Sequence, residues 1–233
     1  RLVHRIVDHR QHCAIVYFRA IGHRFVRELR IRFPARVDAE LVKIVKAAAL
    51  VESNGRSYAD YLCGVFEGDA EFQSAARAWA LEEEQHGHAL ARWAALADPS
   101  FDYPGAFGRF SDKIRLPVGA RDSVRGSRSS ELIARCMVEI GTSSFYSAIR
   151  DASAEPLLRE ICARIAADEI RHYKLFRVHL DRYQAQERLP LWRRLLVLVA
   201  RVRETGDDEL PYAYWAGNGS EGVYDRRTSA RAY

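Results

Sequence analysis

The stretch that decides the fold of this chain is Ala80-Leu81-Glu82-Glu83-Glu84-Gln85-His86-Gly87-His88. Glu83 and His86 stand three residues apart, so on a helix they share one face and lie about one turn apart. The same spacing returns at Glu169 and His172. Two Glu-x-x-His pairs in a chain with helical periodicity predict a carboxylate-bridged two-metal site inside a four-helix bundle.

The turns of the chain predict the partners of these pairs. Gly68-Asp69 supplies a helix stop and a cap, and Ser153 to Pro156 supplies a second turn. A residue at the height of Glu83 on the preceding helix falls near position 52 or 53, and Glu52 is there. The same count from the second turn leads from Glu169 to Glu139. With a rise of about 1.5 Å per residue, both hairpins place their carboxylates about 22 Å from their turns.

The periodicity of the apolar residues predicts an all-α fold with one helical domain over residues 1–204. The core bundle spans about 37–184, with helices expected over 37–66, 70–97, 129–150 and 156–184. Residues 98–126 are rich in proline and glycine and predict one long irregular crossover. Flanking helices are expected over 1–33 and 189–204, and the polar tail 205–233 is expected to be loosely held.

The composition excludes several other classes of protein. The chain is 48% apolar and 29% charged, as in ordinary globular proteins. Its net charge of +5 comes from arginines interleaved with acidic residues, which indicates a solvated surface and not a nucleic-acid site. The chain contains no run of about 18 apolar residues, so we expect no membrane-spanning helix. The four cysteines form no C-x-x-C pair, which favours free thiols, a reducing compartment and a cytoplasmic location.

The donor set indicates the kind of metal. Four carboxylates neutralise two divalent cations, and mixed oxygen and nitrogen ligands suit iron or manganese better than a closed zinc site. A glutamate buried among apolar neighbours must be paired or bound to metal. Buried salt bridges to arginine remain the alternative for these carboxylates. A second cluster, His9 and His12, could ligate a surface metal, although solvated histidines flanked by arginine are the more common case.

Three segments resemble the soluble, plant-type acyl-acyl-carrier-protein desaturases of the ferritin-like di-iron carboxylate superfamily. Residues 161–172 resemble that family's I-C-x-x-I-A-A-D-E-x-R-H string, and residues 77–87 resemble its R-A-W-x-x-E-E-x-x-H-G. Glu139-Ile140-Gly141-Thr142 keeps its E-x-x-T. The resemblance covers roughly residues 50–180 and implies a ferritin-like four-helix bundle with a long crossover and additional flanking helices.

The resemblance implies a cofactor of two iron ions, with manganese as an alternative at one or both positions. Glu83 and Glu169 would bridge the ions, and each ion would have one terminal glutamate and one histidine. Asp168 would orient a ligating histidine. Thr142, on the face of Glu139, would help deliver protons beside the dioxygen site, although a threonine that only packs between helices is an equal alternative. The implied ligand set is Glu52, Glu83, His86, Glu139, Glu169 and His172.

The chain also departs from the family. It is much shorter than the plant enzymes, and its first 35 residues do not match them. No tryptophan precedes Trp79, so the family's N-terminal tryptophan of the electron route has no evident counterpart. Val51-Glu52-Ser53-Asn54 does not repeat the family's E-E pattern at the first glutamate. These departures concern the substrate and the carrier-protein contacts, and they leave the predicted metal ligands intact.

The sequence therefore predicts an O2-dependent di-iron oxidoreductase that oxidises an apolar substrate, most plausibly an acyl chain. The expected partners are an electron donor such as ferredoxin and an acyl carrier protein, and a homodimer is what the resemblance suggests. One alternative is a ferroxidase or rubrerythrin-like peroxidase with the same ligands and no organic substrate. The other is a non-enzymatic helical module that uses Leu191–Val199 as a groove or membrane-surface ligand.

Overall fold

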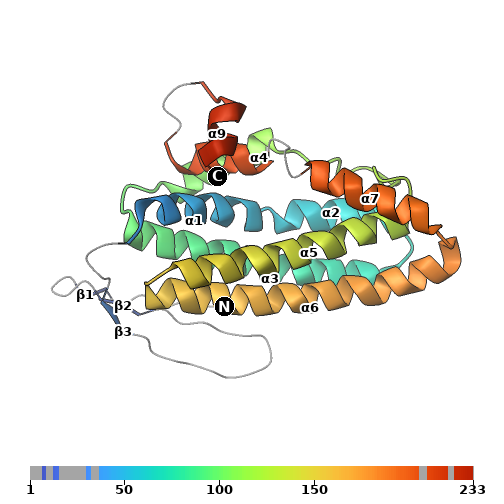
Figure 1. The fold of residues 1–233 in the computed structure, drawn as a ribbon, viewed down its shortest axis with the longest axis horizontal. Coiled ribbons are helices and arrows are strands. Elements are labelled where there is room, and N and C mark those ends of the chain that lie inside the picture. The colour runs from blue at the N-terminus through green and yellow to red at the C-terminus, as the bar shows by residue number, and fades with distance from the viewer. Residues whose placement is uncertain are drawn as a thin grey trace.

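A computed structural model of the chain describes residues 7–8, 13–15, 30–32, 37–204, 209–219 and 223–232. Helices dominate these residues (Figure 1). The helices are α1 (Ala39–Glu52), α2 (Gly55–Val65), α3 (Ala70–Ala97), α4 (Tyr103–Lys113), α5 (Arg128–Ala152), α6 (Pro156–Glu187), α7 (Leu191–Glu204), α8 (Glu209–Gly217) and α9 (Arg226–Ala232). None of the helices in the described part is long and apolar enough to cross a membrane.

Four long helical tracts form the body of the molecule. α2 continues the line of α1, and this tract packs against α3, while α5 packs along α6 and α3 also contacts α6 (Figure 1). Each tract begins at a side chain that caps free backbone N–H groups. Asp38 accepts from Glu40 N at 2.8 Å, and Asp69 accepts from Phe72 N at 3.0 Å, after the left-handed turn at Gly68 with φ +86°.

The second hairpin is bounded in the same way. Ser127 caps α5 through Ser130 N at 3.1 Å, and Glu155 caps α6 through Leu157 N and Leu158 N. Pro156 occupies the first turn of α6, where its missing N–H costs nothing. Glu155 also accepts from Trp93 Nε1 at 2.7 Å, which joins this turn to α3.

The expected helix over 37–66 is interrupted beside the predicted ligand Glu52. α1 ends at Glu52, Ser53 and Asn54 form a turn, and α2 begins at Gly55. Ser53 Oγ donates to the Ala49 carbonyl at 2.6 Å, a local bond that competes with the regular helix. Asparagine also favours turns. The prediction of one continuous helix is therefore wrong at this point.

Three further segments differ from the prediction. The crossover 98–126 contains the helix α4, and the tail contains α8 and α9. Leu50 and Ala47 of α1, Phe110 of α4 and Tyr214 of α8 belong to one apolar cluster, so part of the tail is packed and not loosely held. In the region 1–33, the described residues form three short antiparallel strands in the order β1 (Val7–Asp8), β2 (Cys13–Ile15) and β3 (Arg30–Arg32), where helix was expected. His9 and His12 lie outside the described residues.

The core of the four tracts consists of two apolar clusters that follow one another along the helices. One contains Ala49 of α1, Leu90 of α3, Tyr146 of α5 and Ile165 of α6. The other is built by α2, α3, α5 and α6 around Leu62, Ala76, Cys136 and Phe176. On each tract the predicted ligands fall in the interval between the two clusters. The fold therefore places a polar layer between two apolar layers.

Candidate metal centre

The structure brings all six predicted ligand residues together in this polar layer. All are charged or titratable, and all are almost completely buried: Glu52 at 5% exposed, Glu83 at 8%, His86 at 6%, Glu139 at 1%, Glu169 at 1% and His172 at 2%. They come from α1, α3, α5 and α6. Burying four carboxylates without arginine or lysine partners is costly unless protons or cations neutralise them.

One atom of each residue is buried and has no hydrogen-bond partner. These atoms are Glu52 Oε2, Glu83 Oε1, His86 Nδ1, Glu139 Oε2, Glu169 Oε1 and His172 Nδ1. They face one another across short gaps. His86 Nδ1 lies 3.5 Å from Glu52 Oε2 and 3.4 Å from Glu169 Oε1, and His172 Nδ1 lies 3.0 Å from Glu83 Oε1. Buried polar atoms normally have partners, so these six converging donor atoms could serve as ligands of a metal ion.

The six residues form two overlapping sets of four. In the first set, ligand atoms of Glu52, Glu83, His86 and Glu169 lie within 4.8 Å of one another. In the second, Glu83, Glu139, Glu169 and His172 meet the same limit. Glu83 and Glu169 belong to both sets. Buried clusters of this composition could hold metal ions, and the sharing of two carboxylates suits two adjacent cations.

The far nitrogen of each histidine is held by a carboxylate from the opposite helix. His86 Nε2 on α3 lies 3.2 Å from Asp168 Oδ2 on α6, and His172 Nε2 on α6 lies 3.0 Å from Glu82 Oε2 on α3. Arg171 donates to both carboxylates, at 2.5 Å to Asp168 and 3.0 Å to Glu82. A carboxylate that accepts from Nε2–H leaves the Nδ1 lone pair free to bind a metal.

Two glycines allow the first hairpin to close around the site. A Cβ on Gly87 of α3 would lie 2.1 Å from Ser53 Oγ and 2.7 Å from Ser53 N. A Cβ on Gly55 would lie 2.6 Å from the Cβ of the predicted ligand Glu83. α3 therefore touches the turn between α1 and α2 at a distance that only glycine permits.

The electrostatics of the metal-free cluster favour protons on several ligands. Burial, reinforced by the negative charge of Glu52, raises the pKa of Glu83 to about 8, and burial with Glu83 nearby raises the pKa of Glu169 to about 10. Burial opposes a charge on His172, but the facing carboxylates of Glu139, Glu82 and Glu83 outweigh it and raise its pKa to about 12. The pKa of His86 is also raised well above its usual value, by Asp168, Glu169 and Glu52 against the effect of burial.

Glu52 behaves differently from the shared carboxylates. Burial raises its pKa, but the facing imidazole of His86 and a hydrogen bond from Tyr146 outweigh burial, and the net pKa is lowered. Tyr146 Oη on α5 donates to Glu52 Oε1 at 2.6 Å. Glu52 is thus held as an anion with one oxygen bonded and the other directed into the cluster.

The two predicted catalytic residues have different surroundings. Asp168 lies beside His86, at the place where an orienting carboxylate was expected. Thr142 is half-buried, and its hydroxyl donates to the Val138 carbonyl of its own helix at 2.8 Å. Its role in proton delivery stays a prediction, as does metal binding by the six ligands.

Sequence reasoning missed Glu82 and Tyr146. A signal for Glu82 was present, because an acidic residue precedes both Glu83 and Glu169, and the two segments share an acid-Glu-x-x-His pattern. Tyr146 lies seven residues after Glu139 and so shares its face of α5.

Two surface cavities occur away from the cluster. The larger, about 650 Å³, lies between the α5 N-terminus and the end of α6, and the other, about 540 Å³, lies at the turn between α5 and α6. Neither is lined by any of the six ligand residues. Cys63, Cys136 and Cys162 are free thiols, and burial raises the pKa of Cys136 and of Cys162 to about 12.

The six ligand residues form an arrangement that helix packing alone does not require. It presents six inward-directed oxygen and nitrogen donors in a water-poor layer, with the two histidines oriented from behind. Buried Glu and His clusters of this kind could hold a metal ion. The chain matches no protein-family model, no curated protein and no solved structure in the comparisons made.

Proposed function

We propose that this chain is a di-iron oxidoreductase that uses dioxygen to oxidise an apolar substrate, with an acyl chain as the substrate class. Bound iron would supply the electrons that dioxygen needs and a place to bind it. The observation that carries the proposal is the convergence of six buried, unpartnered donor atoms in two sets that share Glu83 and Glu169. Mixed carboxylate and imidazole donors without thiolates favour iron or manganese.

The residues of the chain have separate tasks in this proposal. Glu83 and Glu169 would bridge the two ions, because they alone belong to both sets. Glu52 and Glu139 would each bind one ion, together with His86 and His172 respectively. Asp168 and Glu82 would hold the proton on the far nitrogen of each histidine.

Proton supply and partners complete the proposal. Thr142 would release its bond to the Val138 carbonyl and donate toward the cluster, because a hydroxyl can rotate while its helix stays in place. An acidic electron donor such as a ferredoxin, and an acyl carrier protein, would dock on the arginine-rich surface. The net charge of +5 supports such docking only in a general way.

A second candidate function has one specific observation in its favour. The six donors lie in a buried layer between two packed apolar clusters, whereas a long apolar substrate needs a channel beside the metals. A ferroxidase or peroxide-reducing site needs only small reactants. We therefore keep iron or peroxide oxidoreduction without an organic substrate as the competing proposal.

Metal analysis tests the part that both proposals share. The protein purified from iron-replete cells should contain about two metal ions per chain, as the two donor sets require. Glu169→Ala should lose both ions, since Glu169 belongs to both sets. Glu160→Ala is the matched control, because Glu160 lies on the same helix and pairs with Arg164 at the exposed surface.

A metal-free native protein with intact helical content would overturn both proposals and favour the non-enzymatic module. Product analysis then separates the two enzymatic proposals. Electron supply with dioxygen and an acyl substrate should give an oxidised acyl product in the first. Ferrous iron oxidised in many turnovers per site, with the acyl chain unchanged, would assign the second.

A further inference from the structure

The helix α7 carries its apolar residues on the outside of the molecule. Its residues that face the protein are spaced three and four apart and are Arg194, Val197, Arg201 and Glu204. Arg194 Nε donates to the Leu189 carbonyl at 3.1 Å, and Glu204 pairs with Arg125 at 2.7 Å. Three of the four residues that face the protein are charged, which is the reverse of an ordinary surface helix.

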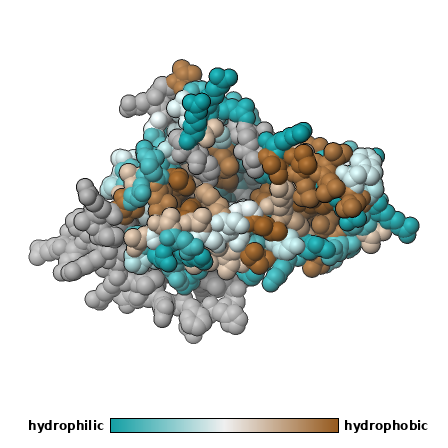
Figure 2. Space-filling model, viewed as in Figure 1, coloured by the Kyte–Doolittle hydropathy of each residue, from teal (hydrophilic) through white to brown (hydrophobic). Residues whose placement is uncertain are grey.

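The outward side of α7 is a continuous apolar face. We define the α7 face by its exposed apolar side chains: Leu191 at 64% exposed, Trp192 at 58%, Leu195 at 52%, Leu196 at 58%, Leu198 at 36%, Val199 at 47% and Val202 at 56%. Brown, hydrophobic surface gathers over α7 in Figure 2. Single exposed leucines are normal on a protein surface, but a face of this size on one helix marks an interaction site.

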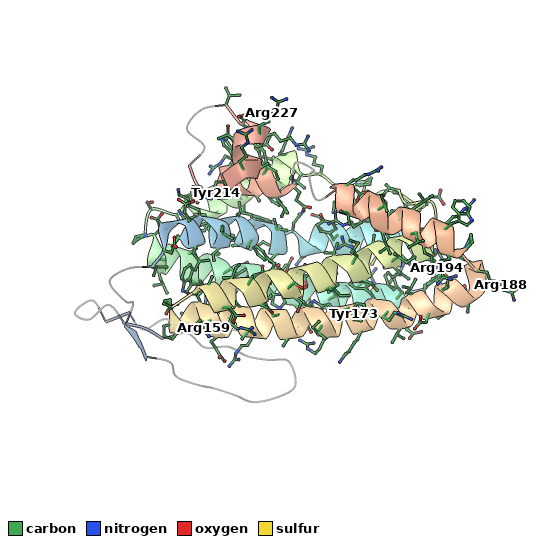
Figure 3. The ribbon with its side chains drawn as sticks, viewed as in Figure 1. Arg159, Tyr173, Arg188, Arg194, Tyr214 and Arg227 are labelled. Carbon is green, nitrogen blue, oxygen red and sulfur yellow. The ribbon has the colours of Figure 1, made fainter. Side chains whose placement is uncertain are left out.

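Positive charge surrounds the α7 face. Residues 187–204 contain five arginines (188, 193, 194, 201 and 203) and two glutamates, 187 and 204, which gives a local charge of +3. Both glutamates are already engaged, Glu187 with backbone N–H groups of α5 and Glu204 with Arg125. Arg188 and Arg194 lie near the ends of α6 and α7 that meet (Figure 3). Arg193 and Arg203 are exposed beside the apolar side chains.

We propose that the α7 face binds an anionic lipid bilayer surface. A helix with leucine and tryptophan on one side and arginine around it lies in the plane of the membrane interface, with its apolar side among the acyl chains. Trp192 suits that boundary, because its ring is apolar and its N–H is polar. The exposed guanidinium groups of Arg188, Arg193 and Arg203 would pair with lipid phosphates.

A second copy of this chain is the competing occupant, and the charges argue against it. Two α7 faces in contact would bring two sets of net positive charge together at the rim, with both local glutamates already paired. An anionic bilayer has the opposite sign and attracts the same arginines. The proposal does not depend on the metal centre and can fail or succeed separately from it.

Co-sedimentation of the full chain with lipid vesicles tests the proposal. The probes are vesicles of phosphatidylcholine mixed with phosphatidylglycerol, and vesicles of phosphatidylcholine alone. Leu195→Gln/Leu196→Gln removes apolar area from the α7 face at exposed positions, so the fold should persist. Val178→Gln is the matched control, since Val178 is 66% exposed on α6, away from the α7 face. Helical content by circular dichroism and the dispersity of each variant are measured alongside.

The native chain should bind the anionic vesicles, bind the neutral ones less, and release on added salt. The double variant should bind at least about tenfold more weakly, because two leucines no longer enter the acyl region, while Val178→Gln binds as the native chain does. Failure of the native chain to bind, or equal binding by the double variant, would overturn the proposal. A dimer that the double variant converts to a monomer, with no vesicle binding, would assign the face to a second copy and overturn it as well.

Discussion

The two helical hairpins supply the candidate metal centre with matching side chains on different backbones. In the second hairpin, α5 runs without interruption past Glu139, and a Cβ added at Gly141 would meet nothing within 4 Å. In the first hairpin, the helix stops directly after Glu52, and Gly87 of α3 lies against the Ser53 backbone. The spacing of the ligands is the same in both hairpins, but Glu139 lies on a continuous helix and Glu52 lies at a helix end.

This difference shows that the two hairpins position their carboxylates through different contacts. In the first hairpin, a backbone contact without room for a methyl group and a tyrosine bond hold Glu52. Burial and neighbouring carboxylates raise the pKa of Glu83 and of Glu169, so their surroundings oppose a negative charge on these two shared groups. Cations would remove that opposition.

The largest expected effect is that of pH, first on the stability of the protein without metal and then on metal binding. A carboxyl whose pKa is raised in the folded state contributes stability that is full below its unfolded pKa and lost as the pH rises through its folded pKa. Glu83, with a pKa of about 8, and Glu169, with about 10, follow this rule, as does His172 with about 12. The temperature at the midpoint of thermal unfolding, measured without metal, should therefore decrease as the pH is raised from about 6 to about 9.

Metal binding should have the opposite sign. A cation must displace the protons on these groups, so its affinity rises on the order of tenfold per pH unit for each proton displaced. Thermal unfolding with and without Mn²⁺, a redox-stable probe, measures both trends. Glu83→Gln/Glu169→Gln should flatten the pH dependence of the metal-free protein. A stabilisation by Mn²⁺ that stays constant with pH would show that metal and protons do not compete here.

Adding a methyl group to a glycine in each hairpin tests whether the two hairpins differ in the room beside their backbones. Gly87→Ala should lower the free energy of unfolding by about 3 kcal/mol, because its Cβ meets the Ser53 backbone and the Ala49 carbonyl. Gly141→Ala is the matched control inside α5 and should raise stability by about 0.5 to 1 kcal/mol, as alanine favours helices. Urea denaturation measures both variants. Equal effects at the two positions would mean that the close approach in the first hairpin is not rigid.

The carboxylates behind the histidines test whether the hairpins hold their imidazoles equally. Asp168→Asn should weaken the metal bound by His86, and Glu82→Gln the metal bound by His172, each by about 10- to 100-fold. Competition with a chelator measures the affinities. Glu84→Gln is the control, because Glu84 pairs with Arg56 and not with a histidine. If either variant weakened both metals equally, the two histidines would not act separately.

The sequence predicted the parts that depend on local spacing. Glu52 and Glu139 could be located by counting from the turns, because helical rise is constant over most of each tract. The break at Ser53 was missed although Ser53-Asn54-Gly55 is a local turn signal. The close approach of Gly87, 34 positions away, could not be found, since no local pattern reveals it. Periodicity predicted a helix near α7 but not which side faces the protein. The packing of α8 depends on the Leu50 side of α1, which no local pattern reveals.

The smallest expected effect concerns the single hydrogen bond from Tyr146 to Glu52. Tyr146→Phe keeps the buried ring but leaves Glu52 Oε1 without that donor, which should lower the free energy of unfolding of the metal-free protein by about 1 to 1.5 kcal/mol. The loss should shrink in the metal-loaded protein, because a cation neutralises the same carboxylate. Tyr183→Phe is the control, since Tyr183 donates to Asp69 at the far end of α3. Equal effects of metal on both variants would mean that Tyr146 contributes only to packing, and the asymmetry between the hairpins would then reduce to the backbone break at Ser53.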